Sequence, residues 1–389
     1  DVFRFCTGLE EIIIENGATL IGQGMFSNCD SLTSVTIPGS VKELKIRAFA
    51  DCTELQEVTI EKGVQSIAKS AFESCDHLKS IIISDNEISI DSSAFNGCCE
   101  ITNVTMPSRY IKSLRTDNLE SITIPDGATV VEEDAFSNLH TLKNITIPES
   151  VTRIENRAFS GCSLANIVIP SNVEYIGDYA FYDCSSLTAD LIIPESVEYI
   201  GESAFEGCFD LENVVVPDGA TVGNRAFKNC PHLTSATISA NNTDRVIDKS
   251  ILTDITVTGT WIEEYAFRGL DNLRNVTIAN SVTSIGKSAF YECAGLEEII
   301  IPENVTNISE SAFYRCNNLK NVTILSKNCH IASRHEYSNI SMEAIPASIT
   351  IYGYYGTPTQ DYARKNRNEF IPLDNTCNHA WNRMEIIKY

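Results

Sequence analysis

One pattern of apolar and polar positions recurs along the chain, usually at intervals of 22 to 24 residues. Each copy is marked by a phenylalanine, at Phe3, Phe26, Phe49, Phe72, Phe95, Phe136, Phe159, Phe181, Phe205, Phe227, Phe267, Phe290 and Phe313. Isoleucine or valine stands nine and eleven residues after it, usually with proline next, as in Val35, Ile37 and Pro38. This alternation predicts a short strand with one face inward, and proline suits its end, where no further ladder donor is needed.

Each copy has further apolar positions, such as Ile67, Cys75 and Leu78 around Phe72. A unit of about 23 residues cannot bury its own apolar side, but stacked copies bury a continuous one. We therefore predict a mainly β solenoid of about sixteen coils, with a curved parallel sheet and short turns or one-turn helices on the opposite side. Two longer gaps between phenylalanines, of 41 and 40 residues, predict shortened coils near residues 107–119 and 239–254.

A coil that reads C-x-x-L-x-x-I-x-I-P-x-x-V-x-x-I-x-x-x-A-F closely resembles the BspA-like leucine-rich repeats of bacterial and some protozoan surface proteins. Residues 293–313 match this pattern, and residues 184–205 match it with one extra residue before the strand. The resemblance covers roughly residues 1–373 and implies a single leucine-rich-repeat solenoid. It also implies a secreted or wall-attached location, because the characterised members are adhesins that bind host extracellular-matrix proteins or other cells. The family carries no catalytic residues that could be transferred to this chain.

Within this expected domain, residues 1–325 hold the repeats and residues 326–373 hold an irregular stretch and a C-terminal closing unit. The closing unit resembles that of the family, which implies a strand, a short helix and a last strand over the open end. Residues 374–389 depart from the family pattern and are expected to form a tail or linker. Because the chain begins with Asp1 rather than methionine, we also expect a mature or trimmed product.

The charge balance excludes two classes of partner. The chain has 29 Lys and Arg against 52 Asp and Glu, a net charge of −23. This field repels phosphate backbones and anionic lipid headgroups, so we expect neither nucleic-acid binding nor attachment to a membrane surface. Direct membrane insertion is also not expected, because no apolar run approaches the roughly 20 residues that a span requires.

The cysteines favour a packing role over a disulfide framework. Of fourteen cysteines, eleven stand three residues after the phenylalanine, and Leu139 and Leu270 hold that place in two other coils. A position that accepts leucine is an apolar core position, where a free cysteine behaves as a small hydrophobe. Cysteines of adjacent coils would lie about 5 Å apart, which a disulfide can span, so distance alone leaves pairing open. Three cysteines stand outside this ladder, at Cys99, Cys329 and Cys377.

No catalytic constellation is evident in the sequence. His77, His140 and His232 fall in different coils, in turns before the strands, and have no repeated acidic or nucleophilic companion. Cys329 with His330 or His335 could form a nucleophilic pair, but neither an orienting third residue nor an oxyanion loop accompanies it. We therefore expect a non-enzyme with no catalytic residues, no cofactor and no metal site.

A candidate partner-binding face follows from the strand alternation. Residues eight and ten after the phenylalanine point away from the core. The candidate contacts there are Thr36, Thr59, Thr105, Thr146, Thr237, Thr277, Thr323, Asn144, Asn213 and Asn275. Charges are few at these positions, namely Glu11, Glu57 and Glu298. The pattern fits either ordinary cross-strand packing or an extended, weakly charged binding face.

Irregular segments are alternative contacts, since insertions in solenoids often carry specificity. The candidates are Tyr110 and Arg115 in the first shortened coil and Trp261 after the second. We predict a non-catalytic, adhesin-like module at the cell surface or outside the cell. It would be a monomer that binds a protein or glycan, an extracellular-matrix component included. A structural spacer in a larger surface protein is the alternative.

Overall fold

The computed structural model describes residues 2–114, 117–188, 190–239, 251–333 and 343–374. It confirms the predicted fold class: the chain forms a mainly β parallel solenoid with few helices. The solenoid has about 14 turns of about 23 residues, against the roughly sixteen coils expected. Its residues group into two compact units, unit 1 with residues 1–211 and 219–230 and unit 2 with residues 212–218 and 231–389.

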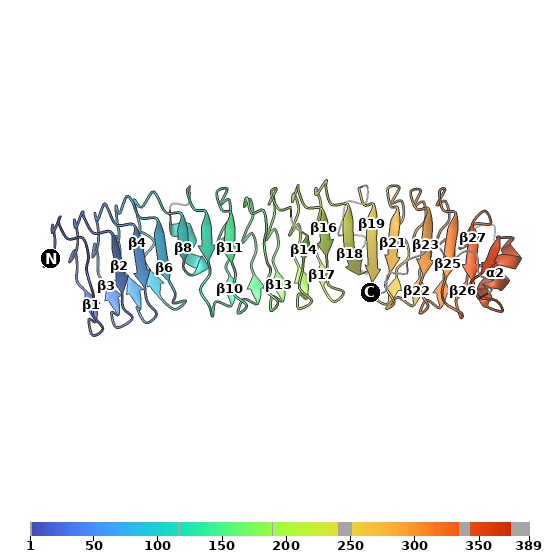
Figure 1. Ribbon diagram of the computed structural model, residues 1–389, viewed down its shortest axis with the longest axis horizontal. Helices are drawn as coiled ribbons and strands as arrows, with labels where there is room; N and C mark the ends of the chain where they lie inside the picture. The colour runs from blue at the N-terminus through green and yellow to red at the C-terminus, as the bar shows by residue number, and fades with distance from the viewer. Residues whose placement is uncertain (1, 115–116, 189, 240–250, 334–342, 375–389) are drawn as a thin grey trace. The chain divides into compact units, whose positions relative to one another are not determined.

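Unit 1 has one wide parallel sheet formed by the strands that the sequence pattern predicts (Figure 1). Along each strand, buried side chains alternate with exposed or half-buried ones, because valine or isoleucine occupies every second position. The strands, in chain order and each hydrogen-bonded to the next, are β2 (Ser34–Ile37), β4 (Glu57–Ile60), β6 (Ser80–Ile83), β8 (Asn103–Thr105), β9 (Ser121–Thr123) and β11 (Asn144–Thr146).

A second row of strands lies on the other side of the coils, where only turns or one-turn helices were expected. Each strand has two residues, of which the second is the buried aliphatic residue five before the phenylalanine, such as Leu44 or Ile67. In unit 1 these strands form two sheets, β1 (Leu20–Ile21), β3 (Glu43–Leu44), β5 (Ser66–Ile67) and β7 (Ser89–Ile90), then β10 (Val130–Val131), β12 (Arg153–Ile154), β13 (Tyr175–Ile176), β15 (Tyr199–Ile200) and β17 (Thr221–Val222).

The first shortened coil separates these two sheets. It follows β8 and folds into a 3-10 helix, η1 (Ser108–Ser113), in place of a two-residue strand between β7 and β10. On the wide sheet the same coil still contributes a strand, because β9 pairs in register with β8 and β11. Unit 1 also contains the short strand β14 (Leu191–Ile192).

Unit 2 repeats the two-sided arrangement. Its predicted strands are β16 (Asn213–Val215), β18 (Ser235–Ser239), β19 (Asp254–Thr258) and β21 (Asn275–Ile278) in one sheet and β23 (Glu298–Ile301), β25 (Asn321–Ile324), β27 (Thr350–Gly353) and β28 (Phe370–Pro372) in another. The two-residue strands are β20 (Trp261–Ile262), β22 (Ser284–Ile285), β24 (Asn307–Ile308) and β26 (His330–Ile331).

A short helix, α2 (Pro358–Asn366), stands between the last two strands (Figure 1). Proline suits its first turn, Asp361 complements the positive end of its dipole, and Arg367 ends it in the left-handed conformation. The helix buries Tyr362, whose hydroxyl donates a hydrogen bond to the Ile345 carbonyl oxygen at 2.9 Å. The helix contacts β26, β27 and β28, so it covers the end of unit 2.

The core of each unit is built on stacked phenylalanine rings. Rings of successive coils have centroids 4.9 to 5.5 Å apart, and their planes are within 10° of parallel except for Phe136–Phe159 at 27° and Phe267–Phe290 at 18°. Three runs of such rings occur among the described residues, from Phe3 to Phe95, from Phe136 to Phe227 and from Phe267 to Phe313. The runs end where the shortened coils lack the phenylalanine.

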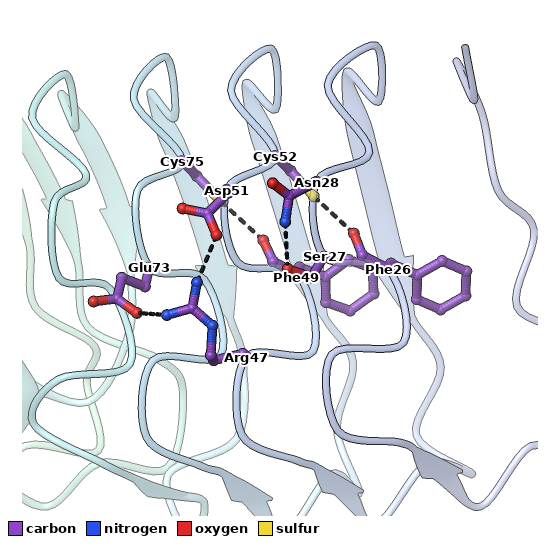
Figure 2. Close-up of polar contacts among 9 residues, drawn as sticks. All are labelled: Phe26, Ser27, Asn28, Arg47, Phe49, Asp51, Cys52, Glu73 and Cys75. Atoms are coloured by element: carbon purple, nitrogen blue, oxygen red, sulfur yellow. Dashed lines mark hydrogen bonds and ion pairs between the residues drawn. The ribbon is translucent and has the colours of Figure 1, made fainter. Parts of the chain in front are cut away.

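The ladder cysteines from Cys29 to Cys316 are buried, and the structure joins none of them in a disulfide, as the packing interpretation predicts. Each thiol donates a hydrogen bond to the phenylalanine carbonyl of the preceding coil, as Cys52 does to Phe26 and Cys75 to Phe49 in Figure 2. Leu139 and Leu270 follow the two shortened coils, which have no phenylalanine to offer that carbonyl. Cysteine is therefore more than a small hydrophobe here, because it satisfies a buried acceptor that leucine could not.

Candidate partner-binding surface

In unit 1 the outward residues of the wide sheet form two straight rows, termed here the two-row face. One row holds Ser34, Glu57, Ser80, Asn103, Ser121 and Asn144, and the other holds Thr36, Thr59, Ile82, Thr105, Thr123 and Thr146. Each residue stands directly beside its counterpart on the next strand, and all are exposed or half-buried. The face therefore repeats the same pair of side chains at the spacing of parallel strands, about 4.8 Å.

Hydroxyl and amide groups dominate this face, although the chain as a whole is strongly acidic. Glu57 is the one ionised side chain among the twelve residues of the two rows, whereas the chain carries a net charge of −23. Threonine and asparagine offer both hydrogen-bond donors and acceptors. The two-row face can thus contact polar groups of a partner without the cost of desolvating fixed charges.

Unit 2 has the same two rows on its own predicted strands. On β16 to β21 they are Asn213, Ser235, Asp254 and Asn275, beside Val215, Thr237, Thr256 and Thr277. On β25, Asn321 and Thr323 stand beside Thr350 and Tyr352 of β27. The candidate threonines and asparagines are thus brought into rows within each unit. The face residues of the shortened coils, Thr123 and Thr256, were missed, although the same alternation marks them.

The rows of unit 2 are interrupted by an apolar hollow of about 250 Å³. It lies where β21 and β23 belong to different sheets, and Thr277 is on its wall. Ile300 and Leu325 also line it and are 51% and 38% exposed. A small, mostly apolar recess is the kind of site that receives an anchoring side chain of a partner.

The remaining candidates do not join these rows. The Tyr110 side chain is half-buried in η1, where its hydroxyl donates a hydrogen bond to the Ile88 carbonyl oxygen at 2.9 Å. The Arg109 guanidinium lies 4.8 Å from the centre of its ring. Trp261 is 52% exposed, but it lies on β20, in a sheet of two-residue strands rather than on the two-row face. Arg115 lies outside the described residues.

The sequence offers Cys329 with His330 as a pair for nucleophilic chemistry. Burial raises the pKa of the Cys329 thiol to about 12, so this cysteine is not a ready nucleophile. His335 and Cys377 lie outside the described residues. In the part of the chain that the structure describes, no three His, Cys, Asp or Glu side chains are grouped to hold a metal ion. None of the described helices has the length and apolar character to cross a membrane.

Comparisons with known proteins identify the repeat. Residues 1–117, 112–234 and 243–355 match the family described as BspA type leucine rich repeat region. A leucine-rich repeat protein from Bacteroides ovatus is similar in structure, with 25% identity over 91% of this chain and 87% of that one and a TM-score of 0.43.

Two further solved structures are similar to this chain. A leucine rich cell surface protein from Faecalibacterium prausnitzii shares 24% identity over 92% of this chain and 83% of that chain, with a TM-score of 0.29. The pneumococcal vaccine antigen PcpA shares 17% identity over 91% of this chain and 84% of that chain, also with a TM-score of 0.29. A comparison with curated proteins finds no match.

Proposed function

Because the chain belongs to the BspA-type leucine-rich repeat family, we propose that it is a non-catalytic binding module that recognises a protein or glycan through its two-row face. The observation that carries this proposal is the contrast between the two-row face of unit 1, with one charge among twelve residues, and a chain of net charge −23. The module acts outside the cell or at its surface. Its resemblance to the repeats of bacterial surface proteins supports this location.

The physical properties of the two-row face suit recognition over a long, shallow contact. Threonine is β-branched, so its side chain loses little conformational entropy when a partner covers it. Because the rows are in register, similar outward side chains repeat from strand to strand. This regular spacing suits a partner that is itself extended or repetitive. Affinity then comes from many modest contacts, with the apolar hollow beside Thr277 as the place for an anchor.

A structural spacer is the second candidate function. Threonine and valine at outward strand positions also stabilise a sheet through cross-strand contacts, as at Thr36 and Thr59 in adjacent strands. The two functions differ in one observable. A spacer tolerates exposed substitutions on every side of the coils, whereas a binding module has one sensitive face.

Replacing Thr146 and Thr237 together by arginine is expected to weaken partner binding at least tenfold. The two residues lie on the two-row faces of unit 1 and unit 2, and each arginine adds bulk and an unpaired charge there. Binding of the purified chain to immobilised extracellular-matrix proteins and glycans measures the effect. A correctly folded double variant that binds as tightly as the parent chain would place the contact elsewhere.

A further inference from the structure

A row of exposed residues crosses one sheet of two-residue strands in unit 1, on a different surface from the two-row face. The register of β12, β13, β15 and β17 places Arg153, Tyr175, Tyr199 and Thr221 side by side. These are the first residues of their strands and are exposed or half-buried, while the second residues are buried. This row is termed here the tyrosine row.

One end of the tyrosine row already holds an arginine. The Arg153 guanidinium carbon lies 4.0 Å from the centre of the Tyr175 ring, and its Nε donates a hydrogen bond to Glu155 Oε1 at 2.8 Å. The other face of Tyr175 stacks on Tyr199, with ring centroids 5.2 Å apart and planes 9° from parallel. A guanidinium held over an aromatic face and paired with a carboxylate is a strong arrangement for arginine recognition.

The other end of the tyrosine row is open. Tyr199 has Tyr175 on one face and Thr221 on the strand next to its other face. The threonine side chain ends at its γ atoms, so it cannot reach over the outer part of a phenol ring. Among the described residues no ring or cation is placed against that face, whereas the equivalent face of Tyr175 is covered by Arg153.

Exposed carboxylates stand close to Tyr199 along the chain. Glu198 and Glu202 are both exposed and flank Tyr199 at one and three residues along the chain. Burial raises the pKa of the Tyr199 phenol, and the negative charges of Asp178 and Glu202 raise it further. The open end of the tyrosine row therefore combines an aromatic face with nearby negative charge, as the Arg153 end does.

We propose that the open face of Tyr199, above Thr221 and beside Glu198 and Glu202, binds an arginine side chain of a partner protein in the manner of Arg153 on Tyr175. Arginine fits better than lysine because its planar guanidinium stacks on a ring and still bonds to a carboxylate at its edge. The net charge of −23 favours the approach of a basic segment. This site is separate from the two-row face, so the result of its test does not depend on whether the proposed function is correct.

Two fluorescent nine-residue peptides test the site, one alternating arginine with glycine and the other lysine with glycine. Fluorescence anisotropy at physiological salt should show tighter binding of the arginine peptide to the parent chain. Tyr199→Leu is expected to weaken that binding about five- to tenfold, because the stacking contact is lost. Thr221→Arg should weaken it similarly, because its own guanidinium would occupy the Tyr199 face.

A charge-matched comparison separates this site from general attraction to an acidic chain. Glu198→Gln with Glu202→Gln should weaken binding, whereas Glu54→Gln with Glu100→Gln, which removes equal charge at exposed positions in other coils, should leave it nearly unchanged. Three results would each overturn the proposal: no binding of the arginine peptide, equal affinity for both peptides, or unchanged affinity in both Tyr199→Leu and Thr221→Arg. Circular dichroism confirms that each variant is folded.

Discussion

Phe159→Ala is expected to lower the free energy of unfolding by about 3 to 5 kcal/mol. The Phe159 side chain is 0% exposed, and its ring stacks on Phe136 and Phe181 with both centroid distances at 5.0 Å. Alanine would leave a cavity in the middle of the ring column and remove two stacking contacts at once. Urea titration followed by circular dichroism measures the change.

The control for this substitution is Phe5→Ala, because Phe5 is 61% exposed. Its ring contacts the guanidinium of Arg4 at 4.8 Å, a surface interaction, and its loss is expected to cost less than about 1 kcal/mol. If the two substitutions lower the free energy of unfolding equally, the stacked rings are not a main source of stability.

The chain is expected to lose stability steeply above pH 9 under reducing conditions, because of its buried thiols. Burial raises their pKa from the ordinary value of 9.0, to about 12 for Cys52, Cys162, Cys230 and Cys329. Burial also raises the pKa of the thiols of Cys29, Cys184 and Cys208. A folded thiol thus keeps its proton at a pH where an unfolded one has lost it.

The sign of the effect follows from proton binding. Below about pH 9 both states hold the proton and the thiols contribute no pH dependence, whereas between pH 9 and the raised pKa the unfolded state binds fewer protons. Each thiol with a pKa near 12 then lowers the free energy of unfolding by about 1.4 kcal/mol per pH unit, and the four of them by about 6. Since domains are stable by only about 5 to 15 kcal/mol, one pH unit removes a large part of the stability.

Chemical denaturation at several pH values from 8 to 11 measures this dependence. A variant with Cys162→Ala and Cys184→Ala should show a slope above pH 9 that is smaller by about 3 kcal/mol per pH unit, although its stability at pH 8 is lower. Thiolate absorbance near pH 9 that corresponds to most of the fourteen cysteines, while the chain is still folded, would mean that the ladder thiols are not protected by burial.

The fold was predictable because the core residues of a solenoid occupy the same positions in every repeat. Residues such as Phe72, Leu78 and Ile81 recur at fixed offsets, and their burial follows from stacking. The second row of strands was not predictable, since a two-residue strand such as Ser66–Ile67 is too short to show alternation. The hydrogen-bonding role of the cysteines also needed the structure, because it depends on which carbonyl lies opposite each thiol.

Backbone conformation is a second feature that the sequence did not reveal. Each coil turns through residues in the left-handed conformation, and they include Arg47 and Tyr179, which rarely adopt it, as well as Asp51 and Asn138. Residue type therefore did not mark these turns. The Arg47 guanidinium bonds to Asp51 of its own coil at 2.6 Å and to Glu73 of the next coil at 2.5 Å, and the second contact links the two coils (Figure 2).

The candidate site was predictable in part, because strand geometry decides which side chains point outward. Strand alternation identifies outward residues such as Thr59 and Thr105, and the register of parallel strands brings them into rows. The tyrosine row could not be recognised from the sequence, because Tyr175 and Tyr199 are 24 residues apart in coils of variable length. Only the register of the two-residue strands shows that they are neighbours.

Two matched arginine pairs test whether the two-row face is the binding surface. Thr59→Arg with Thr105→Arg places two charges on that face, whereas Ser66→Arg with Ser89→Arg places the same charges on β5 and β7, in the sheet of two-residue strands of neighbouring coils. With a matrix protein or glycan that the parent chain binds, the first pair should lower the affinity at least tenfold and the second pair should change it little. Equal affinities for the two folded variants would mean that the two-row face is not the binding surface.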